Sequence, residues 1–283
     1  RGLAKLTGPV RLMISVLQAL WILARLRPSV CVGFGGYPAA PGGLAARLLG
    51  CPLVIHEQNA IAGMTNRHLS RWATRVLTAF PNVLEGGECV GNPVRPEIDQ
   101  IGMNRLADGR QPSDRIRILV VGGSQGARAL NQEVPQVLAQ VSQVGPLSIT
   151  HQTGEAGLTQ VSKAYASLLL EANVVPFIQR MDQAYRDADV VICRAGALTV
   201  SELAAAAMPA LLIPFPYAVD DHQTANGQQL VDAGAALLLK EADVSRWAEV
   251  ITDLVRAPEK LTQMARAARS VAKPQATTMA TDV

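Results

Sequence analysis

The chain has 283 residues, of which 49% are hydrophobic and 17% charged, and it carries a formal net charge of +3. This length accommodates two domains with sizeable buried cores. The sequence has no long lysine or arginine run and no alternation of basic and aromatic residues, which argues against a nucleic-acid partner. Aromatic residues make up only 4% of the chain, and Ala, Leu, Val and Gly dominate instead. That composition favours α/β layers with buried parallel strands.

The first predicted element is a helix over residues 9–26, which are nearly all apolar. Its polar residues Arg11, Ser15, Gln18 and Arg25 fall on one narrow helical stripe. The apolar run is interrupted and shorter than the roughly 20 residues that a membrane span needs. The helix can pack on a sheet, or it can lie partly in lipid with basic residues near anionic headgroups. Both interpretations stay open, because one face of the helix can pack on the sheet while another face lies in lipid.

A rhythm of short apolar strands and helices follows. Strands or extended segments are predicted at 29–34, 52–59, 75–81 and 88–96, and helices at 41–50 and 66–73. Asn92-Pro93 and Arg95-Pro96 then interrupt regular structure. We therefore expect a domain boundary here, giving domains 1–94 and 95–283, and a polar segment from 97 to 115.

A second alternating series fills the rest of the chain. Strands are predicted at 115–123, 147–154, 173–178, 189–196, 209–216 and 235–239, and helices at 127–142, 156–170, 181–188, 198–207, 222–233 and 243–272. Alternating strands and helices indicate parallel, doubly wound sheets. The sequence thus predicts two Rossmann-like domains. Because the chain opens on Arg1 directly in helix-like sequence, we expect the first domain to lack its opening βα units.

Polar residues gather where the predicted strands end, which is where open parallel sheets bind ligands. They are Ser124, Arg194, the run His56-Glu57-Gln58-Asn59 and the run Asp220-Asp221-His222-Gln223. Two glycine-containing turns, 122–126 and 194–197, each lead into a helix. The start of a helix carries about half a positive charge and favours an anion. Two such turns on one side of a sheet indicate a diphosphate ligand.

Ser124 allows two interpretations. Residues 122–126 fit the G-x-S-x-G turn of α/β-hydrolases, and Ser124, Asp189 and His222 follow the chain order of a hydrolase triad. The same turn can instead hold a phosphate through its backbone and the serine hydroxyl. We favour the second interpretation, because a whole α/β domain precedes the turn.

Glu202 is similarly open. Thr199-Val200-Ser201-Glu202 matches a capping box, in which Glu202 would cap its own helix. Alternatively, its carboxylate accepts hydrogen bonds from a ribose diol beside the diphosphate. No metal site is predicted, since the four histidines are far apart and H-E-x-x-H is absent. Asp220-Asp221 has the chemistry to hold a divalent cation, but adjacent acids in a loop are usually solvated.

Six segments, in order along nearly the whole chain, resemble the MurG family. They are "GFGGYPAAPGG", "HEQNAIAGMTN", "GNPVR", "VVGGSQGARALNQ", "CRAGALTVSE" and "DDHQTANG". The resemblance implies the GT-B fold, two Rossmann-like domains with the active site in the cleft. It also implies transfer of N-acetylglucosamine from UDP-N-acetylglucosamine to undecaprenyl-linked lipid I, giving lipid II in peptidoglycan synthesis. Residues 1–94 would then bind the acceptor and the membrane surface, and residues 95–283 would bind the UDP-sugar.

The resemblance further implies an inverting transfer, no tightly bound cofactor, and a peripheral place on the cytoplasmic face of the bacterial inner membrane. An anionic membrane surface and other cell-wall synthesis proteins are the expected partners. Two alternatives remain. One is a UDP-binding, membrane-docking fragment without activity. The other is a UDP-sugar transferase for another lipid such as diacylglycerol, against which the acceptor-side motifs argue.

Site residues carry over from the resemblance position by position. For the donor they are the backbone of Ile178 for uracil, Glu202 for the ribose, Ser124 and the turn Ala197, Leu198, Thr199, Val200 and Ser201 for the diphosphate, Arg95 for the donor, and Gln223 and Asn59 for the sugar. On the acceptor side they are Gly35, Gly36, Tyr37 and Glu57, and for the membrane patch Met13, Leu17 and Trp21. The family's G-G-T-G-G-H loop would precede residue 1. The general base therefore stays unassigned, with His56 and Glu57 as weak candidates.

Overall fold

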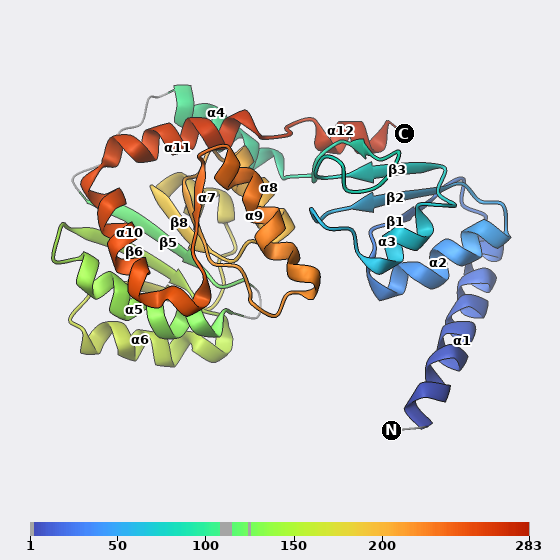
Figure 1. Ribbon diagram of the computed structural model, residues 1–283, viewed down its shortest axis with the longest axis horizontal. Coiled ribbons are helices and arrows are strands. Elements are labelled where there is room, and N and C mark those ends of the chain that lie inside the picture. The colour runs from blue at the N-terminus through green and yellow to red at the C-terminus, as the bar shows by residue number, and fades with distance from the viewer. Residues whose placement is uncertain (1–2, 108–114, 124–125, 283) are drawn as a thin grey trace. The chain divides into compact units, whose positions relative to one another are not determined.

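The computed structural model describes residues 3–107, 115–123 and 126–282 (Figure 1). It divides into two compact units. The first unit comprises Arg1–Asn92 together with Gln275–Val283, and the second unit comprises Pro93–Pro274. In the described part of the chain the strands form one four-stranded and one six-stranded sheet, and every strand pair is parallel. The expected α/β class with two parallel sheets is confirmed.

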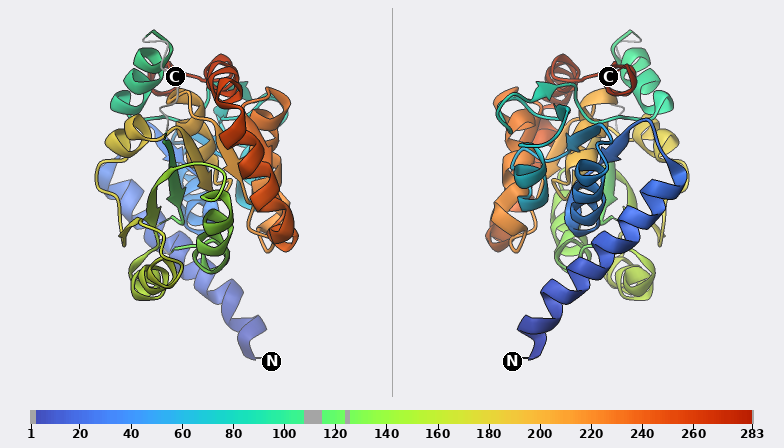
Figure 2. Two further views of the ribbon diagram at one scale, coloured as in Figure 1. Left: turned by 90° about the vertical axis from the view of Figure 1, so that its left-hand side faces the viewer. Right: turned by 90° about the vertical axis from the view of Figure 1, so that its right-hand side faces the viewer.

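The first unit is built on a sheet in the order β1-β2-β3-β4. Its strands are β1 Cys31–Gly33, β2 Leu53–Glu57, β3 Arg75–Thr78 and β4 Glu88–Cys89, and its helices are α1 Leu3–Leu26, α2 Gly36–Leu48, α3 Met64–Leu69 and α12 Ala276–Thr281. Helix α1 packs against α2, and its N-terminal turns extend past α2 (Figures 1 and 2). The helix therefore leaves much of its apolar surface uncovered within this unit.

Helix α12 brings the C-terminal segment back to the first unit. Ala280 packs against a small core of Val54, Leu77 and Val90, one residue from each of β2 and β3 and one just after β4. The sequence prediction had assigned this segment to the second domain. The sequence of this segment gives no signal for the contact, because Ala280 packs against residues that precede it by 190 positions or more.

The second unit has a doubly wound sheet in the order β10-β9-β8-β5-β6-β7, so its first strand lies in the middle. The strands are β5 Ile116–Val121, β6 Leu147–Gln152, β7 Asn173–Val175, β8 Val190–Cys193, β9 Ala210–Leu212 and β10 Ala236–Leu238. The α-helices are α4 Pro96–Ala107, α5 Arg128–Val141, α6 Leu158–Ser167, α7 Met181–Asp187, α8 Ala197–Ala205, α9 His222–Asp232, α10 Val244–Arg256 and α11 Pro258–Ser270. Short 3₁₀ turns cover Glu155–Gly157, Val219–Asp221 and Glu241–Asp243.

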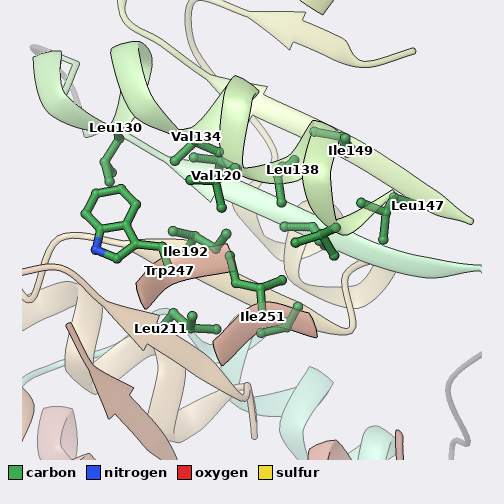
Figure 3. Packing of buried hydrophobic residues seen from close by; sticks show 14 of the residues in the cluster. Val120, Leu130, Val134, Leu138, Leu147, Ile149, Ile192, Leu211, Trp247 and Ile251 are labelled. Carbon is green, nitrogen blue, oxygen red and sulfur yellow. The ribbon is translucent and has the colours of Figure 1, made fainter. Parts of the chain in front are cut away.

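The main core of the second unit lies between its sheet and the helices α5 and α10. Figure 3 shows Leu130, Val134 and Leu138 of α5 directed toward the strands, with Trp247 and Ile251 of α10 beside them. Within each helix these side chains recur four residues apart, which puts them on one helical face. Each such burial contributes about 1.5–3 kcal/mol. This core fixes the strands whose carboxyl ends carry the candidate site.

Helix α4 corrects the expected polar segment at 97–115. Pro96 occupies the first helical position, and Glu97 and Asp99 stand in the first turn, where they complement the helix dipole. Ile98 and Ile101 are buried, and α4 packs against α7 and α8. The four large apolar residues of α4, Ile98, Ile101, Met103 and Leu106, are interspersed with polar residues and a glycine, which obscures the helical period. Tertiary contacts stabilise the helix.

Candidate functional site

The glycine-rich turn after β5 is held in place by the buried side chain of Gln152, the last residue of β6. Its Oε1 accepts a hydrogen bond from the Gly123 N–H at 3.0 Å. Its Nε2 donates to the carbonyl oxygens of Gly123 at 3.0 Å and Pro176 at 2.9 Å. Gln152 thus ties this turn to the segment after β7. The sequence analysis missed it, since a glutamine at a strand end carries no distinctive signal.

Glycine is required within this turn. Gly126 has φ 72°, and a Cβ there would lie 2.2 Å from the Thr153 carbonyl oxygen. Gly123 also has a positive φ, 81°. L side chains rarely adopt this conformation. Ser124 and Gln125 lie outside the described residues, so the expected contact of Ser124 with a phosphate remains a prediction.

The hydrolase interpretation of Ser124 is wrong. Asp189 forms a bidentate ion pair with Arg117, with oxygen–nitrogen distances of 2.7 and 3.0 Å. Arg117 lies at the amino end of β5, whereas the turn with Ser124 follows the carboxyl end of this six-residue strand. At about 3.3 Å per residue, the five steps between the two ends span roughly 17 Å. Asp189 therefore cannot orient a histidine beside Ser124.

The second turn, at 194–197, opens helix α8. Gly196 is the N-cap and makes no side-chain capping hydrogen bond, and the Val200 N–H donates to its carbonyl at 2.9 Å. The first turn of a helix leaves N–H groups without intrahelical partners, which suits an anion. Val200 is buried and can offer only its backbone, while Leu198 is exposed. Ser201 directs its hydroxyl at the Ala197 carbonyl, 3.0 Å away.

Glu202 does not cap its own helix, so the capping-box interpretation is wrong. Because α8 begins at Ala197, Thr199 lies inside the helix rather than at its N-cap. The Glu202 carboxylate instead accepts a hydrogen bond from the Tyr185 hydroxyl at 3.1 Å, and Arg95 approaches its other oxygen at 3.4 Å. Two expected donor residues that are 107 positions apart are thereby brought together. Tyr185 is a further residue that the sequence analysis missed.

Gln223 lies in a cavity with the end of the glycine-rich turn. The cavity has a volume of about 640 Å³, and its lining includes Gly126, Arg128, Arg194 and Gln223. The Gln223 Oε1 accepts a hydrogen bond from the Phe215 N–H at 2.9 Å. That bond directs the amide oxygen at the protein backbone. The amide nitrogen is the group that Gln223 can offer to a ligand.

Arg194 also lines this cavity and is anchored by several contacts. Its Nη1 donates to the carbonyls of Ile213 and Pro214 and pairs with Glu241 at 2.6 Å. Its guanidinium carbon lies 5.5 Å from the centroid of the Phe215 ring. These contacts fix the start of the 194–197 turn to the strand end after β9.

Ile178 follows β7 and lines a second cavity of about 340 Å³ on the second unit. Phe177, exposed, and Arg180 line it as well. The Pro176 carbonyl held by Gln152 lies two residues before Ile178. The backbone of the Ile178 segment is therefore set by the same side chain that sets the glycine-rich turn.

In the first unit, the Gly35-Gly36 turn and the segment after β2 meet at the carboxyl end of the sheet. Gly35 and Gly36 have φ 77° and 72°, and a Cβ on Gly35 would lie 2.8 Å from Asn66 Nδ2. Gln58 Nε2 donates to the Phe34 carbonyl at 2.6 Å. Tyr37, in the first turn of α2, is exposed. Gly35, Gly36 and Tyr37 thus lie together at this end of the first unit, whereas Glu57, at the end of β2, is buried.

His56 and Glu57 are each only 2% exposed. The Glu57 carboxylate accepts hydrogen bonds from the Asn59 N–H and Nδ2, the Gly63 N–H and Asn66 Nδ2, at 2.9–3.2 Å. His56 Nε2 lies 2.9 Å from the Gly91 carbonyl, and burial lowers the pKa of His56. In this geometry both side chains stabilise the fold around the loop after β2. Neither reaches the surface as a general base must.

Met13, Leu17 and Trp21 form one stripe on α1. They are spaced four residues apart, so they share a helical face, and they are 58%, 58% and 65% exposed. Arg25 lies over the Trp21 ring at 5.6 Å. The expected role of this exposed apolar stripe as a membrane patch stays a prediction.

Across residues 3–107, 115–123 and 126–282, no helix is both long and apolar enough to cross a membrane. In the same part of the chain, no group of three or more His, Cys, Asp or Glu side chains is placed to hold a metal ion. Asp220 and Asp221 both have left-handed backbone conformations, and Asp221 accepts a hydrogen bond from Thr224.

Comparison with known proteins agrees with this geometry. Residues 117–280 match the glycosyltransferase family 28 C-terminal domain, and residues 2–78 match the N-terminal domain of the same family. A UDP-N-acetylglucosamine–N-acetylmuramyl-(pentapeptide) pyrophosphoryl-undecaprenol N-acetylglucosamine transferase of Marinobacter nauticus is 50% identical, over 97% of this chain and 77% of its own length. The crystal structure of MurG from Acinetobacter baumannii superposes with a TM-score of 0.84 at 41% identity, covering 97% of this chain and 80% of that one.

A more distant structure, the UDP-GlcNAc 2-epimerase of Neisseria meningitidis, shares the fold alone, with a TM-score of 0.66 at 12% identity over 96% of this chain and 80% of that one. Two parallel α/β units, together with matches to both domains of glycosyltransferase family 28, define a glycosyltransferase of the GT-B fold. Identity of this level over nearly the whole chain narrows the class further. The chain belongs to the MurG family of N-acetylglucosamine transferases within glycosyltransferase family 28.

Proposed function

We propose that this chain transfers N-acetylglucosamine from UDP-N-acetylglucosamine to the C4 hydroxyl of the muramoyl sugar of lipid I, giving lipid II. The observation that carries the proposal is the 50% identity, over 97% of the chain, with the transferase of Marinobacter nauticus. The cavity of the second unit, with a glycine-rich turn, an arginine and Gln223 in its wall, supports a donor of this chemistry.

The second unit would bind the donor. The backbone of Ile178 would pair with uracil, and Glu202 would accept hydrogen bonds from the ribose. The N–H groups at the start of α8 and the Ser124 hydroxyl would hold the diphosphate. Arg95, which already lies 3.4 Å from Glu202, would reach the same nucleotide. Asn59 of the first unit and Gln223 would contact the sugar.

The reaction would be a direct displacement with inversion. The acceptor hydroxyl attacks the anomeric carbon of N-acetylglucosamine, the bond from that carbon to the diphosphate oxygen breaks, and UDP leaves with the bonding electrons. Charge then develops on the diphosphate, and donors already oriented toward it lower the barrier. The acceptor hydroxyl loses its proton to a base that we do not assign.

The first unit would bind the acceptor and the membrane. The Gly35-Gly36 turn, Tyr37 and the backbone shaped by Glu57 would face the lipid-linked sugar. The stripe of Met13, Leu17 and Trp21 would lie in the headgroup region of the cytoplasmic leaflet, with the chain bound peripherally. An amphipathic helix with exposed Leu and Trp and nearby arginines fits such an interface.

Calorimetric titration of the chain tests the donor assignment. UDP and UDP-N-acetylglucosamine should bind at micromolar concentration, and CDP, which differs only in its base, at least tenfold more weakly. Glu202→Ala should weaken UDP binding by about 1.5 kcal/mol or more, as for a lost hydrogen bond to a charged group. Glu249→Ala, on α10, is the matched control and should leave the affinity unchanged. A folded wild-type chain that binds UDP and CDP equally would contradict the proposal.

A further inference from the structure

The carboxylate of Glu202 is held by a buried tyrosine, which a bound nucleotide would not contact. Tyr185 is 1% exposed, on α7, and its hydroxyl donates to Glu202 Oε2 at 3.1 Å. We infer that Tyr185 is a positioning residue of the donor site, which orients the Glu202 carboxylate toward the ribose and thereby sets the preference for ribose over deoxyribose. The inference rests on the proposed role of Glu202 in binding the ribose.

The capacity of the carboxylate supports this arrangement. An ionised carboxylate offers about four lone-pair positions on its two oxygens. Tyr185 takes one on Oε2, and Arg95 approaches Oε1 at 3.4 Å. The remaining positions suit the two hydroxyl donors of a ribose. A hydrogen bond on one oxygen also selects a single rotamer of the glutamate, so less conformational entropy is lost when the ligand binds.

Tyr185 is better suited than Arg95 to hold the glutamate. The Arg95 side chain is 54% exposed and long, and such exposed ion pairs contribute little because water screens them. Tyr185 is rigid and enclosed. Burial raises the pKa of its hydroxyl well above the usual value, and the nearby charge of Glu202 raises it further. The hydroxyl therefore stays protonated and remains a donor at neutral pH.

The backbone at Tyr185 is itself held by Arg105 of α4. Arg105 Nη2 donates to the carbonyl of Tyr185 at 2.7 Å and to that of Ala188 at 2.9 Å. These two bonds attach the end of α7 to α4, the helix that begins directly after Arg95. Hydrogen bonds thus join α4 to the end of α7, and α7 to Glu202 on α8. All of these partners lie in the second unit.

The test compares UDP with 2′-deoxy-UDP by calorimetry on three versions of this 283-residue chain. They are the wild type, Tyr185→Phe, and Tyr165→Phe as a matched control. Tyr165 is also buried in the second unit, and its hydroxyl lies 3.0 Å from His151 Nδ1. Both variants remove one buried hydroxyl, so a general loss of stability affects them alike. Their urea midpoints are measured alongside.

The wild type should bind UDP at least tenfold more tightly than 2′-deoxy-UDP. In Tyr185→Phe that ratio should fall below threefold, mainly through weaker UDP binding, while Tyr165→Phe keeps the wild-type ratio. A Tyr185→Phe chain with an unchanged ratio would overturn the inference and leave the proposed function intact. A wild type that does not bind UDP, or does not distinguish it from CDP, would instead overturn the proposed function and the inference with it.

Discussion

Gly102 of α4 lies directly against the backbone at the end of α8, and adding one carbon there should separate the two helices. A Cβ on Gly102 would lie within 1.9 Å of the Ala205 carbonyl oxygen, 3.0 Å from its carbon and 3.1 Å from the Ala206 carbonyl carbon. All three atoms are backbone, so no flexible side chain can move aside. Gly102→Ala must therefore shift one helix against the other.

The net effect follows from two opposing terms. Overpacking in a close contact costs about 1–3 kcal/mol, and rigid backbone on both sides puts this case at about 3 kcal/mol. Alanine is favoured over glycine in a helix interior by about 1 kcal/mol. Gly102→Ala should thus lower the free energy of unfolding of the second unit by about 2 kcal/mol.

Urea unfolding measures this change, with Gly42→Ala as the control. Gly42 is also inside a helix, α2, but a Cβ there has no neighbour within 4 Å among the described residues. The control should therefore stabilise the first unit by about 0.5–1 kcal/mol. If Gly102→Ala is as stable as the wild type, or gains stability as Gly42→Ala does, the close contact between α4 and α8 does not exist.

Three further predictions concern other parts of the molecule. Burial lowers the pKa of His151 to about 4, so between pH 6.5 and 4 only the unfolded state takes up the proton. The wild type should therefore lose about 2 kcal/mol of stability through this group when the pH falls from 7 to 5. His151→Gln should not show this loss when both chains are compared by urea unfolding at the two pH values. Gln152→Glu keeps an acceptor for one backbone partner but loses both donor bonds, so UDP affinity measured by calorimetry should fall at least tenfold. Unchanged affinity would show that the donor site does not need Gln152 to hold the glycine-rich turn to the segment after β7. Leu17→Glu should abolish co-sedimentation with vesicles containing anionic lipid, whereas Gln18→Glu, with the same charge change on α1, should retain most of it; equal loss in both would assign binding to charge alone.

Much of the fold could be predicted from local pattern. The strands of the second unit are short apolar runs bounded by glycine or proline, and the alternation of strand and helix indicates parallel sheets. The turns at 122–126 and 194–197 were recognised because glycine before a helix has few other uses. Met13, Leu17 and Trp21 were expected from the family resemblance, and all three side chains are exposed on α1.

Other features have no local signal, because they depend on residues far apart in the chain. Helix α4 is stabilised by its packing on α7 and α8, and the segment after 274 joins the first unit through Ala280. The capping-box interpretation of Glu202 failed for the same reason. Its true partner, Tyr185, is 17 residues away on another helix, and only folding of the sheet between them brings the two together.

The sequence by itself determined the class of the fold, the family and the type of residue at most of the candidate site, since these depend on composition, period and motif. The tertiary structure alone decided which atoms those residues contact. Glu57 stabilises a loop, Glu202 is held by a buried hydroxyl, and Gln152 joins two turns. Hydrogen bonds act over about 3 Å, so the role of a polar side chain is set by neighbours that only the folded chain supplies.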